Sequence, residues 1–243
     1  MRKLSLLLAA ITCMQLSLST PVQAAKGPLE GRFGLGYSDV RGNTEESKLN
    51  FDFDLSQQRN ESLKFKYNGL FLRGKANDEL NADKRSLGAV AEFIKTDDFS
   101  WYAGLGYLKD EFAGYKRELS LELGCIHYFI KENDRTLSGN LGVEFTKDHY
   151  TDDTKDDKTW LRLGFDGKTK LAENVHFKAH IGAAAPSKDW DKAYKTDAWV
   201  GLTFTINKNI DTDIKYMVDF NKSPVDGKER YDRTFITSIS YKI

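Results

Sequence analysis

From about Glu30 to the last residue, the sequence alternates apolar and polar residues in long runs separated by breaks. A period of two predicts β-strands with one apolar and one polar face. The runs are about ten residues long, whereas strands in soluble sheets usually have about five or six. A tilted strand needs roughly 9–11 residues to cross a bilayer, so the run length favours a membrane-spanning sheet.

The alternation predicts about twelve strands, and bacterial single-chain outer-membrane barrels have an even number. The expected strands cover residues 31–39, 46–56, 62–73, 85–95, 99–108, 117–130, 135–147, 158–170, 175–185, 195–206, 210–221 and 230–243.

The breaks between these strands alternate in length. Tight breaks are expected at 57–61, 96–98, 131–134, 171–174 and 207–209, and longer, more polar breaks at 74–84, 109–116, 148–157, 186–194 and 222–229. Outer-membrane barrels have short turns at one end and long loops at the other. We therefore predict an all-β fold, a transmembrane antiparallel up-and-down β-barrel. A soluble sandwich that turns its polar face to solvent is the alternative, and it gives no reason for the alternating break lengths.

The N-terminus has the composition of a secretory signal peptide. Arg2 and Lys3 precede an apolar segment over 4–18, and small residues suited to cleavage follow at 22–24. We expect a cleaved signal peptide over 1–24 and a barrel domain over 25–243. Together, export and the barrel pattern predict the outer membrane of a Gram-negative bacterium.

Charge and cysteine content limit the kinds of molecule the protein is expected to bind and the cross-links it can form. Lys and Arg total 36 and Asp and Glu total 36, and this balance argues against nucleic acid as a partner. After signal cleavage Cys125 is the single cysteine, so no intrachain disulfide forms. The expected partners are outer-membrane lipids, lipopolysaccharide and, during biogenesis, the outer-membrane assembly machinery. That machinery recognises a final strand such as 230–243, which ends on Ile243 where an aromatic residue is usual.

Charged residues recur in the middle of the polar faces. An isolated charge away from water costs several kcal/mol, so these faces are expected to line a wet lumen partly closed by ion pairs across it. The candidate lumen-lining residues are Asp52, Asp54, Lys64, Lys66, Glu92, Glu122, Glu144, Arg162, Asp166, Lys178, Asp213 and Lys215.

Aromatic residues gather near the predicted strand ends, where two interfacial girdles of a barrel would fall. They are Trp101, Tyr107, Phe129, Tyr150, Trp160, Trp199, Phe220 and Tyr231.

Several short motifs occur in a set order. They are Gly36-Tyr37-Ser38, Gly42-Asn43-Thr44, Ser47-Lys48-Leu49-Asn50-Phe51, Gly104-Leu105-Gly106-Tyr107, Leu123-Gly124 with Tyr128, and Asp232-Arg233-Thr234 leading to Tyr241. This series resembles the family of the salt-induced outer-membrane protein YdiY over essentially the whole mature chain. The resemblance implies an outer-membrane barrel of a Gram-negative bacterium and brings no established substrate or reaction.

Two groups of residues partly match known functional motifs, a lipid-hydrolase motif and a calcium-binding loop, but each lacks a residue that the motif requires. His149 and Thr151 imitate the His-x-Ser arrangement of outer-membrane lipid hydrolases, but Thr replaces Ser at a strand end. An acidic stretch over 148–157 lacks the glycine-bearing spacing of a calcium loop and is interleaved with lysines, which favours a solvated loop. We therefore predict no enzyme activity, no cofactor and no metal site.

The charged lumen favours a narrow pore for ions or small solutes, or a structural envelope protein. The family resemblance adds the expectation of a stress-related, salt-induced role. A barrel-wall lipid hydrolase and a loop-mediated lipopolysaccharide-binding or adhesion protein are the alternatives. The sequence indicates neither a solute nor an oligomeric state.

Overall fold

The structure is a computed structural model that describes residues 27–41, 46–76, 79–188, 190, 193–224 and 227–243. The expected signal peptide over 1–24 lies outside the described residues. Within them, no helix is long and apolar enough to span a membrane.

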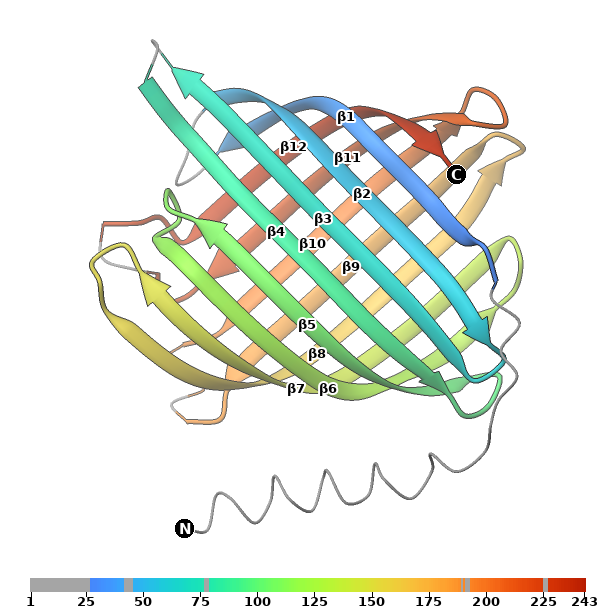
Figure 1. The fold of residues 1–243 in the computed structure, drawn as a ribbon, viewed down its shortest axis with the longest axis horizontal. Helices are drawn as coiled ribbons and strands as arrows, with labels where there is room; N and C mark the ends of the chain where they lie inside the picture. Colours follow the sequence, from blue (N-terminus) through green and yellow to red (C-terminus); the bar gives the residue numbers. More distant parts are fainter. Residues whose placement is uncertain (1–26, 42–45, 77–78, 189, 191–192, 225–226) are drawn as a thin grey trace.

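Twelve antiparallel strands form one closed barrel, in which each strand pairs with its neighbours in sequence and β1 closes on β12 (Figure 1). The strands are β1 (Leu29–Arg41), β2 (Glu46–Asn60), β3 (Leu63–Ala76), β4 (Glu79–Ile94), β5 (Phe99–Asp110), β6 (Tyr115–Lys131), β7 (Arg135–Tyr150), β8 (Lys155–Ala172), β9 (Val175–Pro186), β10 (Lys195–Thr205), β11 (Ile210–Asn221) and β12 (Tyr231–Lys242). The predicted all-β barrel is confirmed.

The barrel has two distinct ends. The turn end carries the start of β1, the end of β12 and the connections at 61–62, 95–98, 132–134, 173–174 and 206–209. The opposite, loop end carries the ends of β1, β3, β5, β7, β9 and β11, the starts of the strands that follow them, and the fully described connections at 111–114 and 151–154. The predicted length contrast remains between β9, which ends at Pro186, and β10, which begins at Lys195, and between β11, which ends at Asn221, and β12, which begins at Tyr231. The loop-end connections at 111–114 and 151–154 are only as long as the turn-end connections at 95–98 and 206–209, because the strands continue beyond their expected ends, so the contrast is absent there.

The largest departure from the predicted bounds is at β4. It begins at Glu79 rather than at residue 85, so most of the expected loop over 74–84 is strand. Backbone pairing continues there, for example between Arg73 and Asp83. The alternation is interrupted by four consecutive polar residues at 83–86, which separate the short alternating stretch at 79–82 from the rest of the strand, although the ladder of backbone hydrogen bonds persists.

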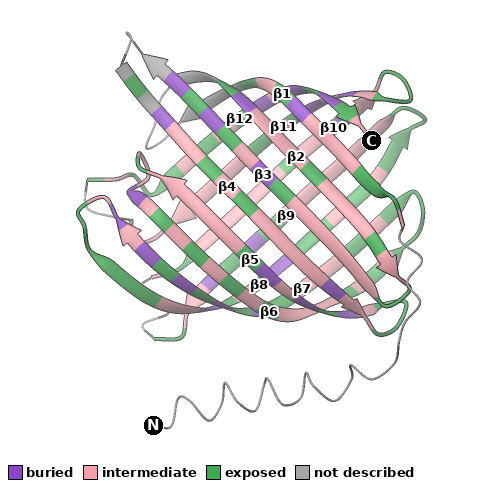
Figure 2. Ribbon diagram, viewed as in Figure 1, coloured by how far each residue is buried: buried purple, intermediate pink, exposed green. Residues whose placement is uncertain are grey.

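The outer surface is apolar and the interior polar. Along β7, Leu141, Val143 and Phe145 are exposed, whereas Glu144 and Thr146 are buried (Figure 2). Large apolar side chains are exposed around the whole barrel, with Leu35 69% and Leu49 77% exposed. A continuous apolar belt of this kind requires an apolar environment, because soluble proteins seldom expose such a surface.

Three of the aromatic residues predicted for the girdles face the lumen instead. Trp160 is 3% exposed and donates a hydrogen bond to Thr146, and Tyr150 is buried and donates one to Asp148. Trp199 stacks on His180. The face of a side chain is set by whether its position along the strand is odd or even (its parity), not by its distance from the strand end. Trp199 is at an odd position, whereas the apolar residues of β10 are at even positions, so its side chain faces the lumen. Trp101, Phe129 and Tyr231 are exposed, with Trp101 on the same outer face as Leu105.

Candidate functional site

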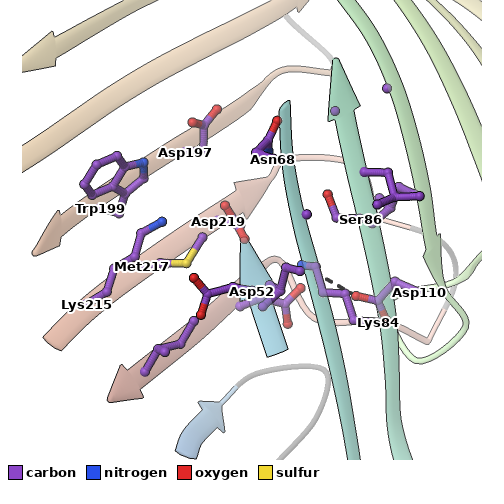
Figure 3. Close-up of a pocket in the computed structure, with 18 of the residues that line it drawn as sticks. Asp52, Asn68, Lys84, Ser86, Asp110, Asp197, Trp199, Lys215, Met217 and Asp219 are labelled. Atoms are coloured by element: carbon purple, nitrogen blue, oxygen red, sulfur yellow. Dashed lines mark ion pairs between the residues drawn. The ribbon is translucent and has the colours of Figure 1, made fainter. Parts of the chain in front are cut away.

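The lumen holds a cavity of about 860 Å³ bounded by side chains from around the barrel wall. Figure 3 shows acidic, basic and apolar groups facing it from several strands, among them Asp52, Asp197 and Lys215. Of the candidate lumen residues, the following line the cavity: Asp52, Asp54, Lys66, Glu122, Glu144, Arg162, Lys178, Asp213 and Lys215. The other three, Lys64, Glu92 and Asp166, are not among its lining residues and lie nearer the turn end of β3, β4 and β8.

A first cluster of charges surrounds Arg32 on β1. Its Nη1 lies 3.2 Å from Asp52 Oδ2 on β2 and 3.0 Å from Asp213 Oδ2 on β11. The same nitrogen donates a hydrogen bond to Ser240 Oγ at 2.8 Å, and Thr203 donates one to Asp213 Oδ1 at 2.7 Å. The single guanidinium thus compensates two carboxylates and is held on one side of the lumen.

A second cluster surrounds Arg162 on β8. Its guanidinium lies 3.1 Å from Glu144 Oε2, 3.5 Å from Asp197 Oδ1 and 3.9 Å from Glu122 Oε1. Tyr102 donates a hydrogen bond to Glu122 Oε1 at 2.5 Å. These carboxylates come from β6, β7 and β10, so the Arg162 side chain on β8 connects four of the twelve strands.

His180 joins this cluster to an aromatic side chain. Its Nδ1 lies 2.8 Å from Asp166 Oδ1 and its Nε2 lies 2.8 Å from Asp197 Oδ2. One ring face stacks on Trp199, and Lys215 Nζ lies 4.2 Å from the centroid of the same indole. A cation above an aromatic face is attracted by the ring quadrupole, so this contact orients the Lys215 ammonium.

Further pairs occur toward each end of the lumen. Near the turn end, Glu92 is 2% exposed, pairs with Lys66 Nζ at 2.8 Å and accepts a hydrogen bond from Tyr128. Toward the loop end, Lys84 lies 3.7 Å from Asp110 (Figure 3). The described pairs of the lumen mostly join strands one or two positions apart, so they follow the wall.

One ion pair covers a longer arc. Lys195 Nζ on β10 lies 3.7 Å from Glu118 Oε2 on β6 and rests over the Trp160 ring at 4.8 Å. The expectation that ion pairs across the lumen close much of it is therefore wrong for most of the described pairs. They run along the wall and leave the cavity between them.

Several central residues of the lumen were not predicted from the sequence. Arg32, Asp197, His180 and Lys195 were not among the candidates, although each occupies a polar-face position of its strand. They could have been identified from the alternation alone, because they lie on the same strand faces as the lumen candidates or as other polar residues. Their partners lie on strands far apart in sequence, and no local pattern specifies those pairs.

The structure does not bring together the two groups of residues that partly match functional motifs, the His149 and Thr151 pair and the acidic stretch over 148–157. His149 Nε2 lies 3.5 Å from Asp153 Oδ1, and within the described residues no contact joins its ring to the Thr151 hydroxyl. Asp148 accepts a hydrogen bond from Tyr150, and Asp152 accepts one from Thr154. Among the described residues, no group of His, Cys, Asp and Glu is arranged to hold a metal ion.

The barrel, its apolar belt and its polar interior define an outer-membrane type of β-barrel. The chain belongs to the family described as "Protein of unknown function, DUF481", whose model matches residues 33–243. The comparison with curated proteins gives no match.

Solved structures similar to this chain include two porins and an outer-membrane channel. The NanC porin has a TM-score of 0.60 and 9% identity, over 89% of this chain and 100% of its own. The KdgM porin in complex with disordered oligogalacturonate has a TM-score of 0.51 and 8% identity, over 86% and 99%. An outer-membrane channel from Pseudomonas putida F1 has a TM-score of 0.50 and 8% identity, over 93% and 97%. At these identities the likeness shows a shared fold.

Proposed function

We propose that the protein is a narrow pore of the outer membrane of a Gram-negative bacterium, through which ions and small hydrophilic solutes pass. The observation that carries this proposal is the cavity of about 860 Å³ between charged groups that pair along the wall. Its volume is in the range of small-molecule sites, so it suits ions and solutes of roughly sugar size. The likeness in fold to porins supports conduction.

The orientation follows from the two ends. In outer-membrane barrels the short turns face the periplasm and the longer loops face outward. We therefore place the turn end in the periplasm, with the apolar belt against outer-membrane lipids and lipopolysaccharide. The assembly machinery would recognise β12, whose outer face carries Phe235, Ile239 and Tyr241. The signal peptide expected over 1–24 directs this export.

Single-channel recording of the refolded protein in planar bilayers tests the pore. We expect discrete conductance steps, and a stable insertion that gives none would overturn the proposal. Lys64→Glu with Lys66→Glu should shift the reversal potential toward cation selectivity, because two positive charges become negative on the lumen face of β3. The matched control is Lys95→Glu with Lys208→Glu, which changes two exposed lysines in the turn-end connections.

A physiological role in salt stress rests on the resemblance to the salt-induced YdiY family. We propose that the amount of protein in the envelope rises when external salt is raised. Quantitative immunoblotting of outer-membrane fractions at low and high NaCl tests this, and an unchanged level contradicts it. Conduction and salt response are separate questions, so either result leaves the other experiment informative.

A further inference from the structure

Two pairs of basic residues face each other directly at the turn end of β8 and β9. Lys168 on β8 is the register partner of Lys178 on β9, and Lys170 is the register partner of His176. Lys178 lines the lumen cavity. Lys168 and Lys170 are two residues apart on β8, as are His176 and Lys178 on β9, so the strand alternation places all four on the same face. Like charges directly opposite each other in an antiparallel ladder are destabilising.

Most other cations of the described lumen have an acidic partner. Of these described cations, Lys64 and Lys215 do not have one within 4.0 Å, and the Lys215 ammonium instead lies over the Trp199 ring. Arg32, Lys66, Arg162, His180, Lys195 and Lys242 each have a carboxylate within 4.0 Å. Within the described part of the chain, by contrast, Lys168, Lys170, His176 and Lys178 have neither an ion pair nor a side-chain hydrogen bond, and they face one another in two adjacent cross-strand pairs. The local excess of positive charge is a departure from the pattern of the wall.

The acidic groups that act on this cluster do not neutralise it. Asp213 and Asp54 attract Lys178, and Asp211 attracts His176. Asp213 already pairs with Arg32, and Asp211 already pairs with Lys242 at 2.7 Å. Asp54 also acts on Lys215 and lies in ion-pair contact with neither lysine.

We propose that Lys168, Lys170, His176 and Lys178 form an oxyanion-binding site at the turn-end mouth of the pore. Its ligand class is a small solute that carries carboxylate or phosphate groups, because such groups accept hydrogen bonds from several ammonium donors at once. The side chains point into the lumen rather than toward lipid, so a dissolved anion reaches them and a lipid head group does not. The inference rests on the proposed pore for its role in permeation, although binding itself requires only the lumen.

The site also gives the pore a direction. Toward the loop end, Lys84 lies 3.7 Å from Asp110 and Lys158 lies 3.7 Å from Asp148, so each of these two lysines has an acidic partner. Unmatched positive charge at one mouth concentrates anions at that mouth. Anions added on the turn-end side are therefore expected to block or permeate at lower concentrations than anions added on the other side.

Titration calorimetry of the refolded protein in detergent, with citrate and with inorganic phosphate as separate probes, tests binding without requiring conduction. Lys168→Gln with Lys178→Gln should weaken citrate or phosphate binding by about tenfold or more. Lys95→Gln with Lys208→Gln removes the same charge from exposed positions in turn-end connections and should leave the affinity unchanged. A second variant, Lys170→Gln with His176→Gln, repeats the test where the first fails to fold, as judged by heat-modifiable mobility on gels.

The outcomes separate the two proposals. Wild-type binding that is lost in both lumen variants, together with a reversal potential shifted toward cations, supports the site within a conducting pore. Binding without any conductance supports the site and overturns the pore. Conductance without anion binding, or equal affinity in the lumen and control variants, overturns the site and leaves the pore. Tighter binding of citrate than phosphate assigns carboxylates, and the reverse order assigns phosphates.

Discussion

Arg162 on β8 donates a hydrogen bond from Nη1 to Glu144 Oε2 on β7 at a distance of 3.1 Å. Its register partner on β7 is Gly142, which has no side chain to fill the space beside the guanidinium. Glu122 and Asp197 approach the same guanidinium from β6 and β10. Arg162 thus lies beside three carboxylates, one of which, Asp197, also contacts His180 Nε2 at 2.8 Å.

Replacing Arg162 with Gln should therefore destabilise the barrel. The change removes charged hydrogen bonds and leaves the carboxylates facing one another, so the free energy of unfolding should fall by about 1.5–3 kcal/mol. Urea unfolding in detergent micelles, followed by tryptophan fluorescence, measures this difference. Arg135→Gln is the matched control, because Arg135 pairs with Glu132 in an exposed turn, with side chains 55% and 62% exposed. It should change stability by less than about 1 kcal/mol, and similar effects for both variants would contradict the role of Arg162.

Gly142 also makes room for Tyr102. A Cβ at Gly142 would lie 2.5 Å from the Tyr102 hydroxyl oxygen and 2.9 Å from Glu122 Oε1, which are hydrogen-bonded to each other. Gly142→Ala should displace that pair and lower the free energy of unfolding by about 1–3 kcal/mol.

Gly104→Ala is the control for this crowding. The nearest atom to a Cβ at Gly104 is Val90 Cγ2 at 3.5 Å, an ordinary contact. Alanine there should be neutral or slightly stabilising, since it reduces the freedom of the unfolded chain. The same urea titration applies, and equal losses for both alanine variants would show that contact with Tyr102 does not decide the effect.

The tryptophans report which faces meet lipid. Trp101 is 51% exposed on the outer face of β5, whereas Trp160 and Trp199 lie in the lumen. In variants that keep one tryptophan each, brominated lipids should strongly quench the fluorescence of Trp101. They should quench Trp160 and Trp199 little, because the barrel wall separates these rings from the acyl chains. Equal quenching of all three would contradict the assignment of the faces.

Strand parity predicted much of this fold and site. The alternation of Leu141, Val143 and Phe145 with Gly142 and Glu144 assigns both faces of β7, and the same rule places most of the candidate charges in the lumen. The rule needs a contrast between the two faces, so it did not predict the start of β4, which four consecutive polar residues at 83–86 separate from the alternating remainder of the strand.

The ion pairs and hydrogen bonds between lumen side chains could not be predicted from the sequence. Asp197 meets His180 through adjacent strands but meets Arg162 from two strands away. Such contacts depend on strand register, barrel tilt and side-chain length together. The unmatched cross-strand pair of Lys168 and Lys178 depends on register in the same way, and neither residue shows in the sequence which residue it faces.

Asp153 provides a pH-dependent test in the connection at 151–154. Lys116 Nζ donates a hydrogen bond to its Oδ1 at 2.5 Å, and His149 Nε2 lies 3.5 Å from the same oxygen. The Lys116 hydrogen bond and charge, with His149 adding less, hold the pKa of Asp153 below its ordinary value. A lowered carboxyl pKa means that the stabilising contribution is present above the ordinary value and is lost as the pH falls through the folded value.

Lys116→Gln should therefore raise the pKa of Asp153 toward its ordinary value, as measured by NMR titration of the side-chain carboxyl carbon. Asp152 is the internal control, because the pKa of its carboxyl is lowered chiefly by hydrogen bonds from Thr154 rather than by Lys116. Its titration should be unchanged in the variant. A parallel shift of both carboxyls would indicate that the whole connection had rearranged, and an unchanged Asp153 would show that Lys116 does not determine its pKa. A selective shift of Asp153 would establish the contact between β6 and the connection that follows β7.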